Sequence, residues 1–117
     1  MKTLRLLRNL SMRQLRVFLS AARHGSFSKA ATELNLSAPA VSMQIKEMEG
    51  DIGIALFARI GRRVELTSAG EYFLVYARRI AANLRDAEAT LSKLKGTEAG
   101  TLKIGLVSTA KYFLPQL

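Results

Sequence analysis

The sequence predicts a mainly α-helical protein in which three short helices and a small β-hairpin, over residues 10–67, precede one long helix, over residues 68–95. Three observations predict this fold class. Hydrophobic residues make up 49% of the 117-residue chain, which is enough for a compact core. Serine precedes three short amphipathic stretches, and glycine or asparagine follows each of them. No Gly or Pro occurs between Gly70 and Gly96, so the last helix is expected to be uninterrupted.

The charge of the chain favours a polyanionic partner. Its 18 Lys and Arg residues outnumber its 9 acidic residues, which gives a net charge of +9. Residues 1–67 contain 11 of the basic and 5 of the acidic residues, so the front half is the better candidate for contacting phosphate. A surplus of this size favours nucleic acid first and an anionic membrane second.

The composition also narrows the class of protein. The chain has no cysteine, which excludes disulfides, thiolate metal sites and a cysteine nucleophile, and which fits a reducing cytoplasm. No apolar run approaches the ~20 residues that a bilayer span needs. Only residues 1–10, which we interpret as a basic arm, resemble a membrane-surface helix, and they are too short to anchor firmly. We therefore expect a cytoplasmic protein with no membrane partner and no cofactor.

The first helix is predicted to begin at Ser11, because Ser11-Met12-Arg13-Gln14 has the form of a capping box. It is predicted to end at Gly25, the usual left-handed stop. Its apolar residues recur at intervals of three and four, which indicates one buried face. That face comprises Met12, Leu15, Phe18, Leu19 and Ala22.

Two further helices follow, joined by a tight turn at residues 35–37. Ser26 is expected to cap the second helix, and Asn35 can adopt the left-handed conformation that ends it. Ser37 is expected to cap the third, with a proline in its first turn, where proline is tolerated. Its predicted buried stripe is Val41, Ile45, Met48 and Ile52, and Gly53 ends it. Two short helices around a tight turn form a helix-turn-helix, here over about residues 27–46.

A β-hairpin is expected next, with strands at 56–59 and 64–66 and a basic tip at residues 61–63. Thr67 is expected to cap the long helix. Apolar residues alternate steps of four and three along it, a period of 3.5 that predicts a coiled coil and therefore a homodimer. These residues, which we expect to be exposed on a single chain, are Phe73, Ala77, Ile80, Leu84, Ala87, Leu91 and Leu94. The alternative is an amphipathic helix that folds onto its own domain.

The helix-turn-helix predicts binding to double-stranded DNA, because the free face of the third helix can enter a major groove. That face comprises Ala38, Pro39, Ser42, Met43 and Lys46. Ser28 and Lys29, which begin the second helix, are expected to contact phosphates. Arg59, Arg62 and Arg63 lie on or beside the hairpin, where they can hold phosphates or enter a narrow minor groove. The groove face lacks bidentate base readers, so we expect DNA shape to supply part of the specificity.

The sequence disfavours an enzyme. Its only histidine, His24, stands beside a helix-ending glycine, where we interpret it as a partner of the helix C-terminus, and no phosphate-binding loop or paired-carboxylate motif is present. A second alternative is a protein-interaction module built on the coiled coil, whose basic head binds another protein. The hairpin arginines argue against that alternative, and steep salt dependence on duplex DNA would separate the two.

The last segment, residues 96–117, is interpreted as a hinge and the first strand of a second domain. Gly96 and Gly100 flank a polar linker, residues 101–107 are expected to form a strand, and Ser108-Thr109 to begin a turn. Since a strand without a sheet cannot satisfy its backbone, we expect a truncated chain whose second domain begins near residue 100.

Taken together, these motifs resemble the LysR-type transcriptional regulators over nearly the whole chain. The matching segments are residues 26–31, 34–37, 39–42, 56–57 and 66–70, with Ile45, Glu49, Gly53 and Arg59. The resemblance implies a winged helix-turn-helix, a linker helix that pairs antiparallel in a dimer, and an effector domain like a periplasmic binding protein that is absent here. It also implies control by a small molecule, and dimers that pair into tetramers.

Two positions depart from the family pattern: Ala38 stands where Gln is frequent, and Met43 where Arg is frequent. Both changes remove polar contacts, which puts the usual recognition code in doubt. Residues 37–46 and 105–115 most resemble the branch that regulates carbon-dioxide-fixation (rubisco) operons. That resemblance implies a phosphorylated or nucleotide metabolite as effector, with Ser108 and Thr109 near its pocket.

Overall fold

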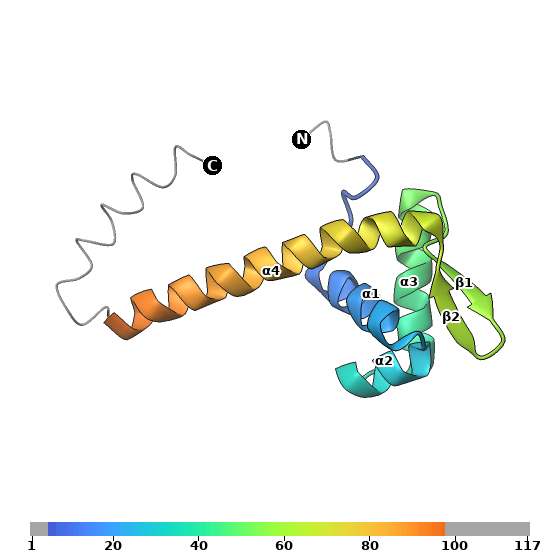
Figure 1. Ribbon diagram of the computed structural model, residues 1–117, viewed down its shortest axis with the longest axis horizontal. Helices are drawn as coiled ribbons and strands as arrows, with labels where there is room; N and C mark the ends of the chain where they lie inside the picture. Colours follow the sequence, from blue (N-terminus) through green and yellow to red (C-terminus); the bar gives the residue numbers. More distant parts are fainter. Residues whose placement is uncertain (1–4, 98–117) are drawn as a thin grey trace. The chain divides into compact units, whose positions relative to one another are not determined.

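The computed structural model describes residues 5–97, in which four helices and one hairpin follow in order (Figure 1). The elements are α1 (Met12–His24), α2 (Phe27–Leu34), α3 (Ala38–Ile52), β1 (Phe57–Ile60), β2 (Arg63–Leu66) and α4 (Ser68–Thr97). The chain divides into two compact units within α4, between Arg79 and Ile80. We call residues 5–79 the head and residues 80–97 the distal helix.

The helix starts predicted from the sequence, and the ends predicted for α1, α2 and α3, are confirmed. The long helix α4 continues through Gly96 to Thr97, two residues past its predicted end at residue 95, so these residues extend the helix instead of opening the predicted hinge. The Ser11 hydroxyl accepts from the Gln14 N–H at 3.1 Å, and the Gln14 side chain accepts from the Ser11 N–H at 3.2 Å, which completes the capping box of α1. The Ser26 and Ser37 hydroxyls accept from the N–H groups of Lys29 and Ala40, which caps α2 and α3 without the reciprocal side-chain bond. Gly25 and Asn35 adopt left-handed conformations, with φ of 62° and 58°, so α1 and α2 end where expected.

The core of the head lies where α1, α2 and α3 pack on one another and β2 contacts α1. Val41, Ile45 and Met48 of α3 are buried, as predicted, whereas Ile52, the last residue of the predicted stripe, is only half-buried. The full set of buried hydrophobic residues is Leu15, Val17, Phe18, Ala21, Ala30, Ala31, Val41, Ile45, Met48, Leu56, Val64 and Ala77.

The buried face of α1 differs from the predicted one. Met12, predicted to be core, is 51% exposed, while Val17 and Ala21 are buried. Because α1 is covered by several elements at once, its buried face is broader than a single stripe and is centred elsewhere. Met12 lies in the first turn, where it lines an open groove with Leu34 and Leu36.

The hairpin is antiparallel, and its register pairs Phe57 with Leu66 and Ile60 with Arg63. Its first strand begins one residue later than predicted. Arg63, predicted at the tip, belongs to β2, so Gly61 and Arg62 alone form the turn. The Val64 N–H donates to the Gly25 carbonyl at 3.1 Å, which ties the hairpin to the corner between α1 and α2.

One carboxylate fixes the connection from α3 to the hairpin. A single oxygen of Glu49 accepts from the N–H groups of Leu56 and Phe57, at 2.8 and 3.1 Å. Leu56 is buried, so these donors would otherwise have poor access to water. Glu49 therefore orients the first residues of the hairpin relative to α3.

The start of α4 is equally constrained. The Thr67 hydroxyl accepts from the Gly70 N–H at 3.0 Å, as its predicted capping role requires, and donates to the Ala55 carbonyl at 2.7 Å. A Cβ atom at Gly70 would lie 2.1 Å from the Leu56 carbonyl oxygen. The helix thus approaches the backbone so closely that only glycine fits there.

The first turns of α4 belong to the core of the head, which corrects the prediction that all seven stripe residues are exposed on a single chain. The Phe73 ring packs on Phe18 with centroids 4.8 Å apart, and Ala77 is completely buried. The apolar residues whose spacing predicted pairing between two chains therefore complete the core of the head at the start of α4. In the distal helix, Leu84 and Leu91 are 45% and 64% exposed, as expected of the stripe, whereas Ile80 and Leu94 are half-buried.

No helix within residues 5–97 has the length and apolar character needed to cross a membrane.

Candidate nucleic-acid interface

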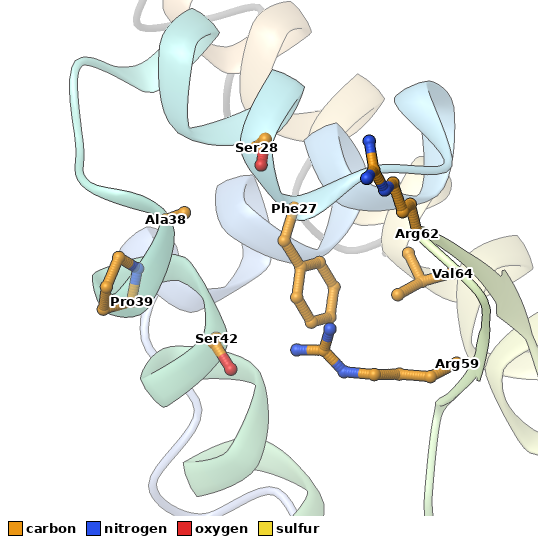
Figure 2. A pocket seen from close by; sticks show the side chains of 8 residues that line it. All are labelled: Phe27, Ser28, Ala38, Pro39, Ser42, Arg59, Arg62 and Val64. Carbon is orange, nitrogen blue, oxygen red and sulfur yellow. The ribbon is translucent and has the colours of Figure 1, made fainter.

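A hollow of about 300 Å³ lies where α2, α3 and the hairpin converge (Figure 2). It brings together six of the residues predicted to contact DNA, from three separate elements. They are Ser28, Ala38, Pro39, Ser42, Arg59 and Arg62, and Phe27 and Val64 complete the lining. Two hydroxyls and two guanidiniums thus line one hollow, a set of donors suited to phosphate and base edges.

The outward face of α3 continues from this hollow. Val41 and Ile45 are buried beneath it, so the opposite face of the helix is open. Met43 is 60% exposed and Lys46 is also exposed, as the sequence predicts for a groove-facing surface. This surface combines one hydroxyl, one cation and apolar groups, which suits contact with thymine methyls and a tolerant hydrogen bond.

Ser28 and Lys29 are both exposed in the first turn of α2. The Ser26 hydroxyl accepts from the Lys29 N–H at 3.1 Å, which fixes that turn. The positive end of a helix with a lysine beside it favours an anion such as a DNA phosphate.

The three hairpin arginines have different surroundings. Arg59 lies over the ring of Phe27, with its guanidinium carbon 5.5 Å from the ring centroid. Arg62 lines the hollow from the turn. Arg63 lies outside the hollow's lining and pairs with Glu65 at 3.3 Å, an exposed ion pair of small energetic weight. Lys29, Met43 and Lys46 also lie outside the lining, on the surfaces of α2 and α3.

The sequence pattern did not reveal the contribution of Phe27. Its ring is half-buried and faces both the hollow and Arg59. No local pattern signals this role, because Arg59 is distant in the sequence and meets Phe27 only through the hairpin.

A polar cluster between α1 and α2 was also missed. The Glu33 carboxylate accepts from the Ser20 hydroxyl at 2.5 Å, pairs with Arg23 and contacts His24 Nε2 at 3.1 Å. The Ser20 hydrogen bond, followed by His24 and Arg23, lowers the pKa of Glu33 below its ordinary value. His24, interpreted as a helix-end partner, therefore has an acidic neighbour nine residues away.

Within residues 5–97, no group of three or more His, Cys, Asp or Glu side chains could hold a metal ion. Ser108 and Thr109, the predicted effector-contacting residues, lie outside the described residues.

The fold and the hollow are those of a winged helix-turn-helix protein, with the hairpin as the wing. The chain belongs to the lysR family of bacterial regulatory helix-turn-helix proteins, whose family model matches residues 12–71.

The curated relatives are longer than this chain, which matches only part of each of them. The RuBisCO operon transcriptional regulator of Allochromatium vinosum is 50% identical over 109 residues, which cover 93% of this chain and 36% of that protein. The HTH-type transcriptional regulator CfxR of Cupriavidus necator is 49% identical, over 95% of this chain and 35% of that protein. The chain thus spans about a third of the length of the curated relatives it matches.

Two solved structures that resemble this chain are DNA-binding domains in complex with DNA. The CbnR DNA-binding domain, crystallised in complex with DNA, is 36% identical with a TM-score of 0.65, covering 74% of this chain and 99% of that one. The BenM DNA-binding domain in complex with catB site 1 DNA is 31% identical with a TM-score of 0.70, covering 74% and 97%.

Proposed function

We propose that this chain is the sequence-specific, double-stranded-DNA-binding part of a transcription regulator of LysR type. The observation on which the proposal rests is the convergence of Ser28, Ser42, Arg59 and Arg62 on one hollow beside the open face of α3. The net charge of +9 and the kinship with regulators of rubisco operons support it.

In the proposed mode of binding, α3 enters the major groove and the wing contacts the adjacent backbone or minor groove. Ser42 supplies a hydrogen bond that almost any base accepts, and Pro39 and Met43 contact thymine methyls. Ala38 and Lys46 complete the face that enters the groove. Ser28, Lys29, Arg62 and Arg63 hold phosphates, which fix the register of the protein on the duplex but do not read sequence. With so few base-reading groups, DNA shape is expected to provide part of the specificity.

The remaining properties of the whole regulator are proposed from membership of the lysR family and from the names and lengths of its relatives. It acts in the cytoplasm as a homodimer joined through the distal helix, and the intact protein responds to a small phosphorylated or nucleotide metabolite. Its targets are carbon-fixation genes, and it catalyses no reaction. Residues 10–67 serve as DNA-binding domain and α4 as linker helix, and the residues after α4 lead into an effector domain to which Ser108 and Thr109 contribute.

The test is binding to a random-sequence duplex and to DNA upstream of the neighbouring genes, each across a salt series. We expect tighter binding to the upstream DNA and a steep loss of affinity with salt on both, because bound phosphates release counterions. Weak, salt-insensitive binding to both duplexes would overturn the proposal and favour the protein-interaction alternative.

A variant pair locates the interface. Arg62→Ala should weaken binding to both duplexes alike and reduce the salt slope by about one, as expected for one lost phosphate contact. Arg13→Ala serves as the matched control, because Arg13 lines a separate groove with Met12 and Leu36. Equal effects of the two variants would place the interface elsewhere.

A further inference from the structure

A row of aromatic rings leads from α4 to the hollow. Phe73 packs on Phe18 with centroids 4.8 Å apart, Phe18 on Phe57 at 5.4 Å, and Phe57 on Phe27 at 5.5 Å. The Phe57 and Phe27 planes meet at 85°, the edge-to-face geometry that aromatic pairs prefer. Because Phe18 is completely buried, the row fixes the Phe27 ring from the centre of the core.

The last member of the row is in contact with a charge. The Arg59 guanidinium lies 5.5 Å from the Phe27 centroid, within the range of a cation–π interaction. In Figure 2, Arg59 extends from β1 beneath Phe27, with its guanidinium directed toward the helix that carries Ser42. Arg62 extends elsewhere in the same view and does not share this support.

A guanidinium held over a ring by a cation–π contact still has N–H donors that can bind a base edge or a phosphate. A long, exposed arginine normally loses side-chain entropy when it binds, whereas one that is already oriented loses less. A cation–π contact with a fixed ring is therefore a means of pre-organising a DNA contact rather than of neutralising a charge.

We propose that Phe27 is a positioning residue for DNA binding, which holds the Arg59 guanidinium on the α3 side of the hollow before DNA arrives. The inference rests on the proposed function, because it assumes that Arg59 contacts DNA. It assigns to Phe27 a role beyond its packing in α2.

The test is a double-mutant cycle on the 117-residue chain, using Phe27→Leu, Arg59→Gln and the double variant. The probe is a duplex of about 25 base pairs, selected with this protein from a randomised pool and long enough for two half-sites. We expect Phe27→Leu to weaken binding about two- to fivefold when Arg59 is present, the range of an exposed cation–π interaction. The same change should have no effect in the Arg59→Gln background, and Phe27→Tyr, which keeps the ring, should restore affinity.

Equal loss from Phe27→Leu in both backgrounds would overturn the inference, since a purely structural role acts regardless of Arg59. If the unaltered chain binds no duplex even at low salt, the proposed function fails instead.

A second measurement needs neither DNA nor a stable Phe27→Leu variant. The Arg59 side-chain NMR signals of the free protein should be shifted upfield by the ring current of Phe27. They should move to ordinary values in Phe27→Met, which is unbranched and keeps apolar bulk. Signals at ordinary values in the unaltered chain would overturn the inference.

Discussion

At the scale of the residue, Glu49 shows how much one side chain contributes to the geometry of this head. Its carboxylate accepts from two successive N–H groups, those of Leu56 and Phe57, at the point where the chain leaves α3 for the hairpin. Phe57 in turn packs on Phe27 and Phe18, so an error in its placement would propagate to the hollow.

Replacing Glu49 by Ala is expected to destabilise the head by about 1–3 kcal/mol, because two N–H donors lose their acceptor. Glu49→Gln, which keeps an acceptor oxygen, should cost less. Urea unfolding measures both, with Glu47→Ala as control, because Glu47 is exposed on the same helix and its loss should change stability by less than about 0.5 kcal/mol. Similar effects of Glu49→Ala and Glu47→Ala would contradict the assigned bonds.

The Glu33 cluster predicts a pH dependence of stability. Because its hydrogen bond from Ser20, together with His24 and Arg23, lowers the pKa of Glu33 in the folded state, the unfolded state binds a proton more readily. The stabilisation is therefore fully present above the ordinary pKa of 4.5 and is lost as pH falls through the lower, folded-state value.

We expect the Tm difference between the unaltered chain and Glu33→Gln to be constant from about pH 6 down to 5 and to shrink below 4.5. Thermal unfolding followed by circular dichroism measures it. A Tm difference that does not change with pH would show that the Glu33 carboxylate has no preferred interaction in the folded head.

Residue identities on the exposed face of α3 could be predicted from the sequence, because a short helix with a clear buried stripe leaves only one other face. The support of Arg59 by Phe27 and the cluster around Glu33 could not. Both join residues that the local pattern treats separately, and both depend on how the elements pack in three dimensions.

At the scale of the element, the helix starts predicted from the sequence were accurate because capping chemistry is local. Ser11, Ser26, Ser37 and Thr67 bond to N–H groups within the next three residues, so each start is encoded beside itself. The buried face of α1 was wrongly predicted because periodicity does not show how many other elements pack against a helix. Met12 lies in the first turn of α1, beyond the part that the other elements bury.

Two glycines in helices are expected to respond to alanine with opposite signs. At Gly70 a Cβ would lie 2.1 Å from the Leu56 carbonyl oxygen, a backbone atom that cannot move freely, so Gly70→Ala should destabilise by about 1–3 kcal/mol. At Gly50, within α3, a Cβ would meet nothing within 4 Å, so Gly50→Ala should stabilise by up to about 1 kcal/mol.

Chemical unfolding of the two variants side by side measures this difference. The pair controls for helix propensity, which favours alanine at both positions, so only the local space can separate them. If Gly70→Ala proved as stable as the unaltered chain, α4 would not approach Leu56 as closely as described.

At the scale of the whole molecule, one helix serves two purposes. Its first turns place Phe73 and Ala77 in the core of the head, while Leu84 and Leu91 of the distal helix remain exposed. The sequence shows one uninterrupted apolar period of 3.5 along α4. It does not reveal where packing against the head ends and an exposed, pairing surface begins, because the same apolar residue types serve both purposes.

Leu84→Glu is expected to convert the proposed dimer to monomer, because a charge on the apolar stripe cannot be buried between two helices. Ala89→Glu is the matched control, since Ala89 is exposed on the same helix but lies outside the stripe. Sedimentation equilibrium should show a monomer for the first variant and a dimer for the second. An unchanged dimer in Leu84→Glu would refute the assigned face.

The burial of Phe73 and Ala77 also determines where the head can be joined to a different protein in a chimaera. A chimaera joined at the hairpin's end, near residue 67, would leave Phe18 without its edge-on neighbour and open the core to water. A junction beyond Arg79 keeps Phe73 and Ala77 with the head, and with them the ring contact to Phe18. The first three turns of α4 are therefore structurally part of the head. When regulators of this kind exchange sensing domains, we expect the boundary of the exchanged segment to lie within this helix rather than at its start.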